Sequence, residues 1–338
     1  MLQVYACCAG PLERNGSDVK ELVMRFLPAE TAVLGTIAAL GAIDIVLIGI
    51  NGIDVDVPGY SLVILVGLAL LAGGQFYRYV RKEEPIASAA IAAGSFVLFS
   101  IVGSAFNYMF LPIRFAPIDP LLMQVDAMLG YHWPAFVGWA AESPWIGTSL
   151  YFIYFTSLPQ LLGLILFLGF SGRTDTLHRF LLTGVLGALL SIGFWIFFPT
   201  FGAKAYDALP ASVLSAIPLA VDPAYGAELV RLGREGVLYL SPKNILGLIG
   251  FPSFHIVMAC MSVYFAMQTR FLFPIFAVLN ALMLPAVLVQ GGHHLTDIFG
   301  GMAAFAIALG CANAGMRILS APQSQTTPIG TREAQVNT

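Results

Sequence analysis

Residues 251–301 read FPSFHIVMACMSVYFAMQTRFLFPIFAVLNALMLPAVLVQGGHHLTDIFGG, and this stretch decides the fold. It holds two apolar runs, near 254–270 and 272–290, that meet around Arg270 with few polar residues between them. Each run has about the length that crosses a bilayer, so together they predict a tight helical hairpin in a membrane. A hairpin returns the chain to the side from which it came. We therefore expect the polar motifs at its two ends to share one face.

The rest of the chain is also strongly apolar. Of its 338 residues, 58% are hydrophobic and 10% are charged, with a mean hydropathy of +0.83; a soluble domain carries roughly 25% charged residues. The sequence predicts an all-α, polytopic membrane helix bundle with about eight transmembrane helices. The segments lie near 31–50, 61–80, 86–111, 146–170, 178–198, 254–270, 272–290 and 297–317.

Charge and cysteine content exclude some classes. The formal net charge is −3 and no run is rich in Lys or Arg, so we expect no nucleic-acid partner. The four cysteines form no metal-binding pattern, and we expect no cofactor. The predicted organisation is a cytoplasmic tail over 1–30, a transmembrane domain over 31–318 and a disordered polar tail over 319–338.

Basic residues predict the orientation, because Lys and Arg near helix ends favour the cytoplasmic side. Eight spans place both tails on one side, and most of the 16 basic residues fall there. Both polar motifs then face outward. The residues on the tail side are Arg14, Lys20, Arg25, Arg78, Arg81, Lys82, Arg173, Arg179, Arg270, Arg317 and Arg332.

Two segments are not expected to span the membrane. Residues 114–145 mix acidic and aromatic side chains among apolar ones, which favours an interfacial helix with tryptophan anchors. Residues 199–253 are predicted to form a long outward-facing active-site loop. Because this loop leads directly into Ser253 and His255, we expect it to cap them.

The second polar motif has the spacing of a His-Asp dyad. His293 and Asp297 are four residues apart and share one face of a helix, so the carboxylate can bind one ring nitrogen and leave the other as a nucleophile or base. His255 supplies a second imidazole as an acid. Free N–H groups at two helix starts, with Gly292 permitting close approach, would favour a phosphate between them.

Two other interpretations of these residues remain open. His255, His293, His294 and Asp297 could bind a divalent ion, although no His-Glu-x-x-His pattern is present. The polar side chains could also be buried, satisfied groups that pack two helices together.

The two motifs, Phe251-Pro-Ser-Phe-His255 and Gly292-His-His-Leu-Thr-Asp297, resemble the second and third signatures of the type 2 phosphatidic acid phosphatase superfamily. The resemblance covers roughly residues 110–315. Within the superfamily, the paired histidines and the stretch 119–133 are most similar to the inositol phosphorylceramide synthase branch.

The resemblance implies phosphoryl transfer through a phosphohistidine, without a metal, in a six-helix core. His293 would be the nucleophile, Asp297 its orienting carboxylate and His255 the proton donor to the leaving group. Ser253 would bind phosphate oxygens.

The sequence also departs from the family pattern. Ala286 and Val287 stand where the family's Ser-Arg is expected, and the Lys-x6-Arg-Pro motif has no match. Other basic groups must then bind the phosphate. Arg234 is the first candidate, since it resembles a loop arginine of the branch, and Lys204 and Lys243 follow.

The predicted function is that of an integral membrane enzyme acting on a lipid phosphate or diphosphate. Water as the acceptor makes it a phosphatase, and a headgroup hydroxyl makes it a transferase of the inositol phosphorylceramide synthase type. A non-enzymatic transporter is the remaining alternative, although no inverted repeat is visible. The architecture resembles bacterial members, which favours a bacterial inner membrane with the site on its periplasmic or outer face. The lipid, the acceptor and the oligomeric state are left open.

Overall fold

The computed structural model describes residues 26–320, and these are mostly helical, as expected. The helices before the site are α1 (Pro28–Asn51), α2 (Val57–Phe76), the π-helix η1 (Tyr77–Arg81), α3 (Glu84–Tyr108), α4 (Asp119–Met128), α5 (Trp133–Glu142), α6 (Pro144–Tyr154), α7 (Ser157–Phe170) and α8 (Thr174–Phe197). They are followed by the 3-10 helix η2 (Ala203–Ala205), α9 (Ala211–Ala216), α10 (Pro223–Glu235), α11 (Phe254–Ala266), α12 (Leu272–Gly291) and α13 (Leu295–Leu319). The one departure from the expected all-α fold among the described residues is a short parallel strand pair, β1 (Asp54–Val55) with β2 (Tyr239–Leu240).

All eight predicted membrane segments are helical. Within the described residues, six helices are long and apolar enough to cross a membrane, and a seventh span results if α6 and α7, bent by 44° at their junction, are counted together. The protein is thus a multi-pass helical bundle.

The sixth predicted segment, 254–270, forms α11, which is shorter than predicted. It has 13 residues, or about 20 Å, whereas the hydrocarbon core of a bilayer is about 30 Å thick. The expected helix to residue 270 ends at Ala266 because the polar residues Gln268, Thr269 and Arg270 form the turn to α12.

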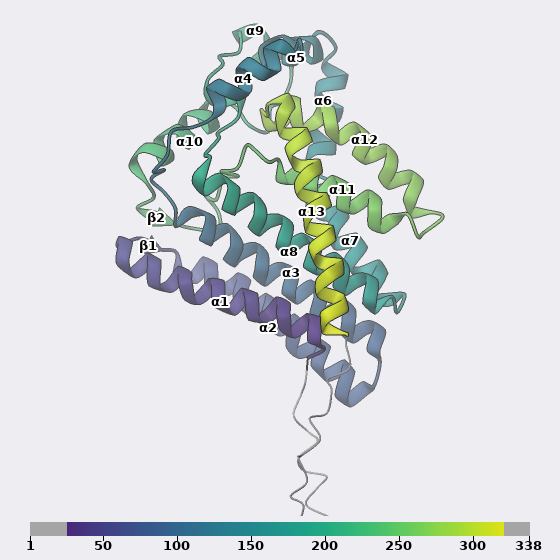
Figure 1. The fold of residues 1–338 in the computed structure, drawn as a ribbon. Helices are drawn as coiled ribbons and strands as arrows, with labels where there is room; N and C mark the ends of the chain where they lie inside the picture. Colours follow the sequence, from purple (N-terminus) through teal and green to yellow (C-terminus); the bar gives the residue numbers. More distant parts are fainter. Residues whose placement is uncertain (1–25, 321–338) are drawn as a thin grey trace, which may run out of the picture.

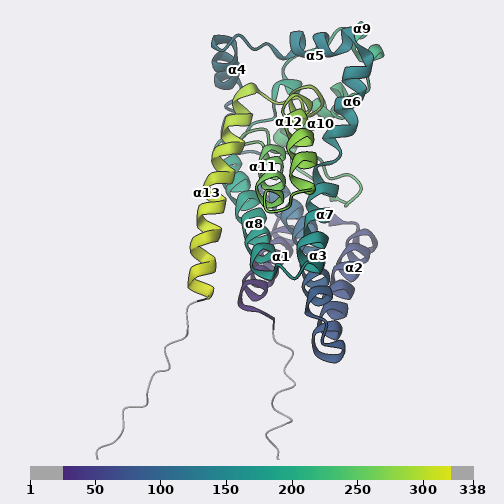
Figure 2. The ribbon, with the colours of Figure 1, turned by 90° about the vertical axis from the view of Figure 1, so that its right-hand side faces the viewer.

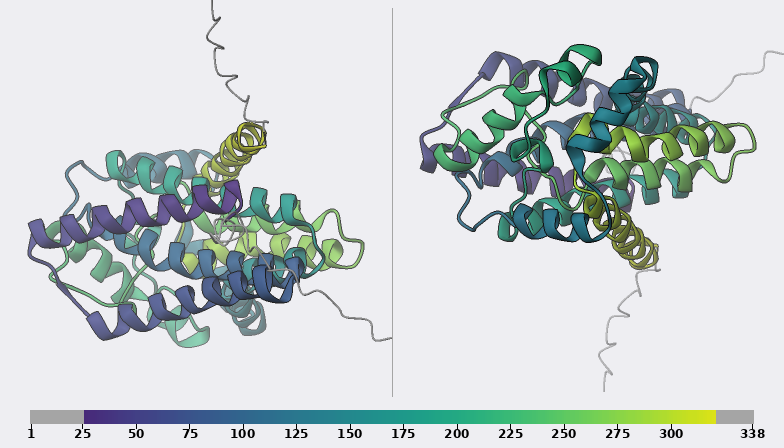
Figure 3. Two further views of the ribbon diagram at one scale, coloured as in Figure 1. Left: turned by 90° about the horizontal axis from the view of Figure 1, so that it is seen from below. Right: turned by 90° about the horizontal axis from the view of Figure 1, so that it is seen from above.

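The helices of the bundle form two groups on either side of a buried centre. Figure 1 shows α1, α2 and α3 on one side and α11 and α12 on the other, and the view from below agrees (Figure 3). Fully buried leucine and isoleucine side chains join α3, α7 and α8 in the centre, among them Ile91, Leu164 and Leu177. Burial of this apolar surface positions the helices that carry the site.

Short helices cover one end of the bundle. In Figure 2, α4, α5 and α9 lie across the end of the bundle opposite to the one where α1 begins and α13 ends. The segment 114–145 was predicted as one interfacial helix, but it forms α4 and α5, separated by a turn in which Gly130 has φ +76°. The segment 199–253 is more ordered than the loop we expected, since it contains η2, α9 and α10.

The predicted domain limits shift slightly. Helix α1 begins at Pro28, inside the predicted amino-terminal tail, because proline suits the first helical turn. Helix α13 continues to Leu319. The remainder of both predicted tails, 1–25 and 321–338, lies outside the described residues.

Candidate active site

The two polar motifs meet, as the hairpin predicted. His255 stands in the first turn of α11, and His293 follows the end of α12, with their ring centroids 6.2 Å apart. Tyr154, at the end of α6, stacks on the His255 ring at a centroid distance of 4.5 Å. An imidazole from the start of α11 and one from the turn between α12 and α13 therefore lie side by side.

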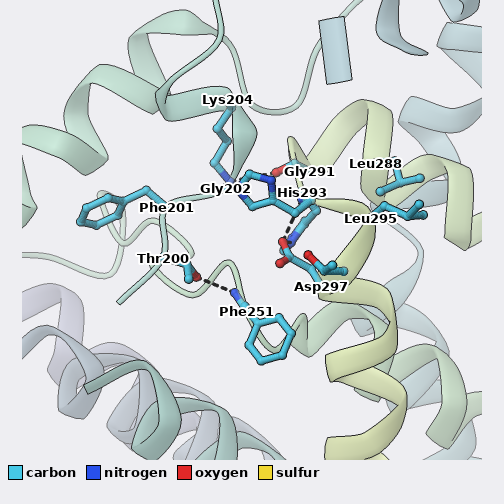
Figure 4. Close-up of polar contacts among 12 residues, drawn as sticks. Thr200, Phe201, Gly202, Lys204, Phe251, Leu288, Gly291, His293, Leu295 and Asp297 are labelled. Atoms are coloured by element: carbon cyan, nitrogen blue, oxygen red, sulfur yellow. Dashed lines mark hydrogen bonds and ion pairs between the residues drawn. The ribbon is translucent and has the colours of Figure 1, made fainter. Parts of the chain in front are cut away.

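His293 and Asp297 form the expected pair, but they do not share a helix as predicted, because His293 lies in the turn before α13, which begins at Leu295. Nδ1 of His293 lies 2.8 Å from Oδ2 of Asp297, which also accepts the backbone N–H of His294 at 3.0 Å (Figure 4). A carboxylate can only accept, so Nδ1 carries the proton and Nε2 remains free. Burial lowers the pKa of His293 despite the opposing effect of Asp297, which keeps the ring neutral and nucleophilic.

His294 has the opposite environment. Its Nδ1 lies 3.2 Å from Asp126 and its Nε2 lies 3.2 Å from Asp119, so both nitrogens must donate and the ring is an imidazolium. Burial disfavours the charge, but the two carboxylates outweigh burial and raise the pKa of His294 to about 10. His294 is a buried cation that joins α4 to the start of α13.

Asp119 also holds the segment that follows α8. Its carboxylate accepts the backbone N–H groups of Phe201 and Gly202 at 3.0 and 2.9 Å, and the hydroxyl of Tyr206 at 3.2 Å. Asp126 in turn accepts the backbone N–H groups of Leu295 and Thr296, at 3.0 and 3.1 Å. We call the group Asp119, Asp126 and His294 the carboxylate brace. It fixes the segments on both sides of His293.

Lys204 is the basic residue that this arrangement brings to the histidines. Its Nζ donates to the carbonyl oxygen of Gly291 at 2.8 Å, next to His293 (Figure 4). Burial lowers the pKa of Lys204 to about 8, although the charges of Asp297 and Asp119 act in the other direction. The Lys204 ammonium therefore lies beside His293, and the carbonyl oxygen of Gly291 is its hydrogen-bond acceptor.

Two glycines permit this close approach. Gly292 has φ +60°, and a Cβ there would lie 2.6 Å from Cβ of Lys204. Gly202 has φ +80°, and its Cβ would lie 2.5 Å from the carbonyl oxygen of Gly292. A side chain at either position is strained. At Gly292 it would displace the lysine, and at Gly202 it would collide with the carbonyl of Gly292.

The other predicted phosphate ligands are placed differently. Ser253 is fully buried, its hydroxyl has no hydrogen-bond partner, and its backbone N–H donates to the carbonyl of Asp297 at 3.2 Å. Arg234 is exposed in the last turn of α10, close enough to Tyr206 for its charge to lower the pKa of that phenol against the larger rise caused by burial. Lys243 is exposed and lies near Asp56. Neither Arg234 nor Lys243 lines the cavity described next.

A cavity of about 410 Å³ opens at the two histidines. Lys204, His255, His293 and Tyr154 line it, while its remaining wall is mainly apolar and comes largely from α3, α7, α8, α11 and the segment 245–249. A single cavity therefore presents an ammonium and two imidazoles to whatever enters from the apolar side.

The metal interpretation required four ligands to converge. Instead, His294 turns to Asp119 and Asp126, away from the His255–His293 pair. Between residues 26 and 320, no group of three or more His, Cys, Asp or Glu side chains is arranged to hold a metal ion.

Sequence reasoning missed the carboxylates of the brace. Asp119 and Asp126 were assigned only to an interfacial segment, although their spacing of seven residues places them on one helix face. This seven-residue spacing was the feature of the sequence that could have identified the pair. Nothing in the sequence indicated that Tyr154 would stack on His255.

A family model described as the PAP2 superfamily matches residues 120–311, more than half of the chain. The match includes both polar motifs, Lys204 and most of the brace. The chain therefore belongs to the PAP2 superfamily. No curated protein and no solved structure gives a significant match.

Proposed function

We propose that this protein is an integral membrane phosphatase or phosphotransferase that acts on a lipid phosphate or diphosphate through a phosphohistidine at His293. The observation that carries the proposal is the free Nε2 of a neutral His293, with Nδ1 held by Asp297 at 2.8 Å. Membership of the PAP2 superfamily supports a phosphate ester as substrate.

The proposed reaction has two displacements. In the first, Nε2 of His293 attacks phosphorus, the bond to the leaving oxygen breaks, and His255 donates a proton to that oxygen. In the second, His255 takes a proton from the acceptor hydroxyl as its oxygen attacks the phosphohistidine and the N–P bond breaks. No carboxylate within the described residues is hydrogen-bonded to His255, so the bound phosphate itself must stabilise the protonated ring.

Lys204 is the phosphate ligand that the geometry favours first. It lines the same cavity as both histidines, and a phosphate oxygen would replace the carbonyl of Gly291 as partner of its ammonium. The unpaired Ser253 hydroxyl and the backbone around Gly292 would bind further oxygens. Arg234 and Lys243, which are exposed and do not line the cavity, remain candidates.

The acceptor distinguishes phosphatase from transferase. The resemblance to the inositol phosphorylceramide synthase branch rests on the paired histidines and the stretch 119–133, and the structure binds His294 to two carboxylates of that stretch. Transfer to a headgroup hydroxyl is the second candidate function, and it rests on that sequence resemblance. Transfer of a labelled headgroup or phosphate to a second lipid, rather than to water, would identify it.

The orientation and location are also proposed. Arg78, Arg173, Arg270 and Arg317 lie at helix ends remote from the histidines, which supports a cytoplasmic location for that end. The site would then open on the outer face of a bacterial inner membrane.

The test is release of inorganic phosphate from a panel of lipid phosphates by the purified protein. His293→Ala should reduce release more than about 10³-fold, because the nucleophile is lost. The matched control is His132→Ala, which removes an exposed histidine outside the site. Equal turnover by His293→Ala and the control would refute the mechanism.

A further inference from the structure

Tyr225, in the first turn of α10, contacts the side chain of Lys204. The Lys204 ammonium lies over the Tyr225 ring, with Nζ 5.3 Å from the ring centroid. An ammonium within about 6 Å of an aromatic ring centroid is attracted by the negative face of the ring. The same Nζ donates to the carbonyl oxygen of Gly291, beside His293. Two contacts therefore hold the ammonium, and the Tyr225 ring supplies one of them.

The backbone of α10 also contacts Lys204. A Cβ at Gly226 would lie 2.6 Å from the carbonyl oxygen of Lys204, so the first turn of α10 packs directly on η2. The carboxylate of Asp222 caps this turn by accepting the backbone N–H of Tyr225 at 2.8 Å. The Tyr225 ring is thus placed by a capped helix end rather than by a free loop.

The hydroxyl of Tyr225 makes a separate contact with the cavity wall. It accepts the backbone N–H of Gly247 at 2.7 Å and donates to the carbonyl oxygen of the same residue at 3.4 Å. Burial raises the pKa of the Tyr225 phenol, so the phenol keeps the proton that it donates. Gly247 belongs to the segment 245–249, which lines the cavity and has no regular secondary structure. Side-chain hydrogen bonds therefore hold this segment in place.

A second tyrosine holds the neighbouring residue of the segment in the same way. The hydroxyl of Tyr108, the last residue of α3, accepts the backbone N–H of Leu246 at 2.6 Å and donates to its carbonyl oxygen at 3.3 Å. Both tyrosines line the cavity. Within residues 26–320, however, the ring that carries the Lys204 ammonium is that of Tyr225. Tyr108 therefore allows the hydroxyl contact to be examined without the ring contact.

We propose that Tyr225 is a positioning residue of the phosphate site: its ring holds the Lys204 ammonium beside His293, and its hydroxyl fixes the segment 245–249 as a wall of the same cavity. The inference rests on the proposed function, in which Lys204 binds the phosphate. One side chain thus connects the phosphate ligand to the cavity wall, and it acts on the phosphate through the lysine.

Two substitutions separate the role of the ring from that of the hydroxyl. Tyr225→Leu removes both, whereas Tyr225→Phe keeps the ring over Lys204 and loses the hydrogen bonds to Gly247. Tyr108→Phe is the matched control, because it removes the same kind of hydrogen bonds at Leu246 and leaves the Lys204 contact in place. Tyr225→Met replaces Tyr225→Leu if thermal unfolding in detergent shows that the latter does not fold.

The first measurement is the dissociation constant of inorganic phosphate, by calorimetry on the purified full chain, because it requires no turnover. Tyr225→Leu should weaken binding by about tenfold, as expected for the loss of one partly buried cation–π contact. Tyr225→Phe and Tyr108→Phe should each weaken it by less than about threefold, since the ammonium keeps both of its contacts. When Lys204→Ala is also present, Tyr225→Leu should cost no more than Tyr225→Phe, because the ring acts through the lysine.

The second measurement is the pH dependence of kcat/KM with decyl phosphate, with the protein in nanodiscs. The Tyr225 ring favours the charged form of Lys204, whose pKa is about 8. Tyr225→Leu should therefore move the alkaline decline of kcat/KM to lower pH by about one unit, whereas Tyr225→Phe and Tyr108→Phe should leave it unchanged. The other groups that interact electrostatically with Lys204 are the same in all these variants, namely Asp119, Asp297, His255 and His293.

The outcomes separate this inference from the proposed function. Additive losses of phosphate binding for Tyr225→Leu and Lys204→Ala, or equal effects of Tyr225→Leu and Tyr225→Phe on binding and on the pH profile, would overturn the positioning role while leaving phosphate release intact. Failure of the unaltered protein to release phosphate from any ester would overturn the proposed function. The binding measurement would then still decide whether Tyr225 acts through Lys204.

Discussion

His293 and His294 are neighbours in the chain but occupy opposite environments. His293 is neutral, has one nitrogen free and faces the cavity, whereas both nitrogens of His294 are bound by carboxylates and its ring is charged. The difference comes from the partners: Asp297 is four residues from the first histidine, and Asp119 and Asp126 come from α4. Two identical side chains thus have different roles: His293 is placed to react, and His294 holds α4 against the start of α13.

The comparison predicts that replacing His294 lowers stability, whereas replacing His293 lowers activity. His294→Ala leaves Asp119 and Asp126 buried without their cation, which should cost about 3–5 kcal/mol of stability. His293→Ala should retain the fold while losing activity. Thermal unfolding in detergent measures the difference, with His132→Ala as the control. An unfolding temperature for His294→Ala equal to that of the control would contradict the brace.

Lys204 is the charged residue that lines the cavity with His293, and its replacement tests the phosphate site rather than the brace. Lys204→Ala should lower kcat/KM by about 10–100-fold, because one charge-assisted phosphate contact is lost. The pKa of Lys204 is about 8, so kcat/KM of the unaltered enzyme should fall as the pH rises through that value and the ammonium loses its charge. Lys204→Arg should move this decline to higher pH. A pH profile that is the same for Lys204→Arg and the unaltered enzyme would exclude the lysine as the group that titrates.

The charge of His294 can be tested through the pH dependence of stability. Its pKa rises from 6.5 to about 10 on folding, so its stabilising effect is complete below pH 6.5 and is lost as the pH rises toward 10. The slope contributed by this one proton is at most about 1.4 kcal/mol per pH unit. His294→Gln should remove that slope between pH 7 and 10. Identical slopes for the two proteins would mean that the histidine is neutral.

The smallest effects on kcat/KM are expected for the two exposed basic residues outside the cavity, Arg234 and Lys243. Arg234→Ala and Lys243→Ala should each change kcat/KM by less than about threefold, since both side chains are exposed and charges at such positions contribute little. This expectation reverses the order of the sequence-based prediction, which placed Arg234 before Lys204. A larger loss in Arg234→Ala than in Lys204→Ala would restore that order.

Much of this arrangement was predictable because it depends on local sequence. The apolar runs predicted eight helical segments, of which 146–170 is divided into α6 and α7 and α11 is too short to count as a span. The hairpin between Ser253 and His293 required its two ends to meet. The His293–Asp297 pair was predicted from its spacing of four residues, but the predicted shared helix was wrong, because His293 lies in the turn before α13 and Asp297 reaches back to it from the first turn.

The remaining contacts join distant segments and could not be inferred in this way. Asp126 and Asp119 lie 168 and 175 positions from His294, and Lys204 lies 87 positions from Gly291. Lys204 also binds a backbone carbonyl, which leaves no signature in side-chain identity. Only the packing of α4 and η2 against the ends of α12 and α13 brings these groups together.

The central claim is that His293 alone becomes phosphorylated. A brief reaction with ³²P-labelled lipid phosphate, quenched in alkali, should leave label on the protein, because phosphohistidine is stable in base and labile in acid. Peptide mapping should place it at His293, and His293→Ala should carry none, while His294→Gln that remains folded should still be labelled. Label on His294 or Ser253, or no labelled protein during rapid turnover, would contradict the account.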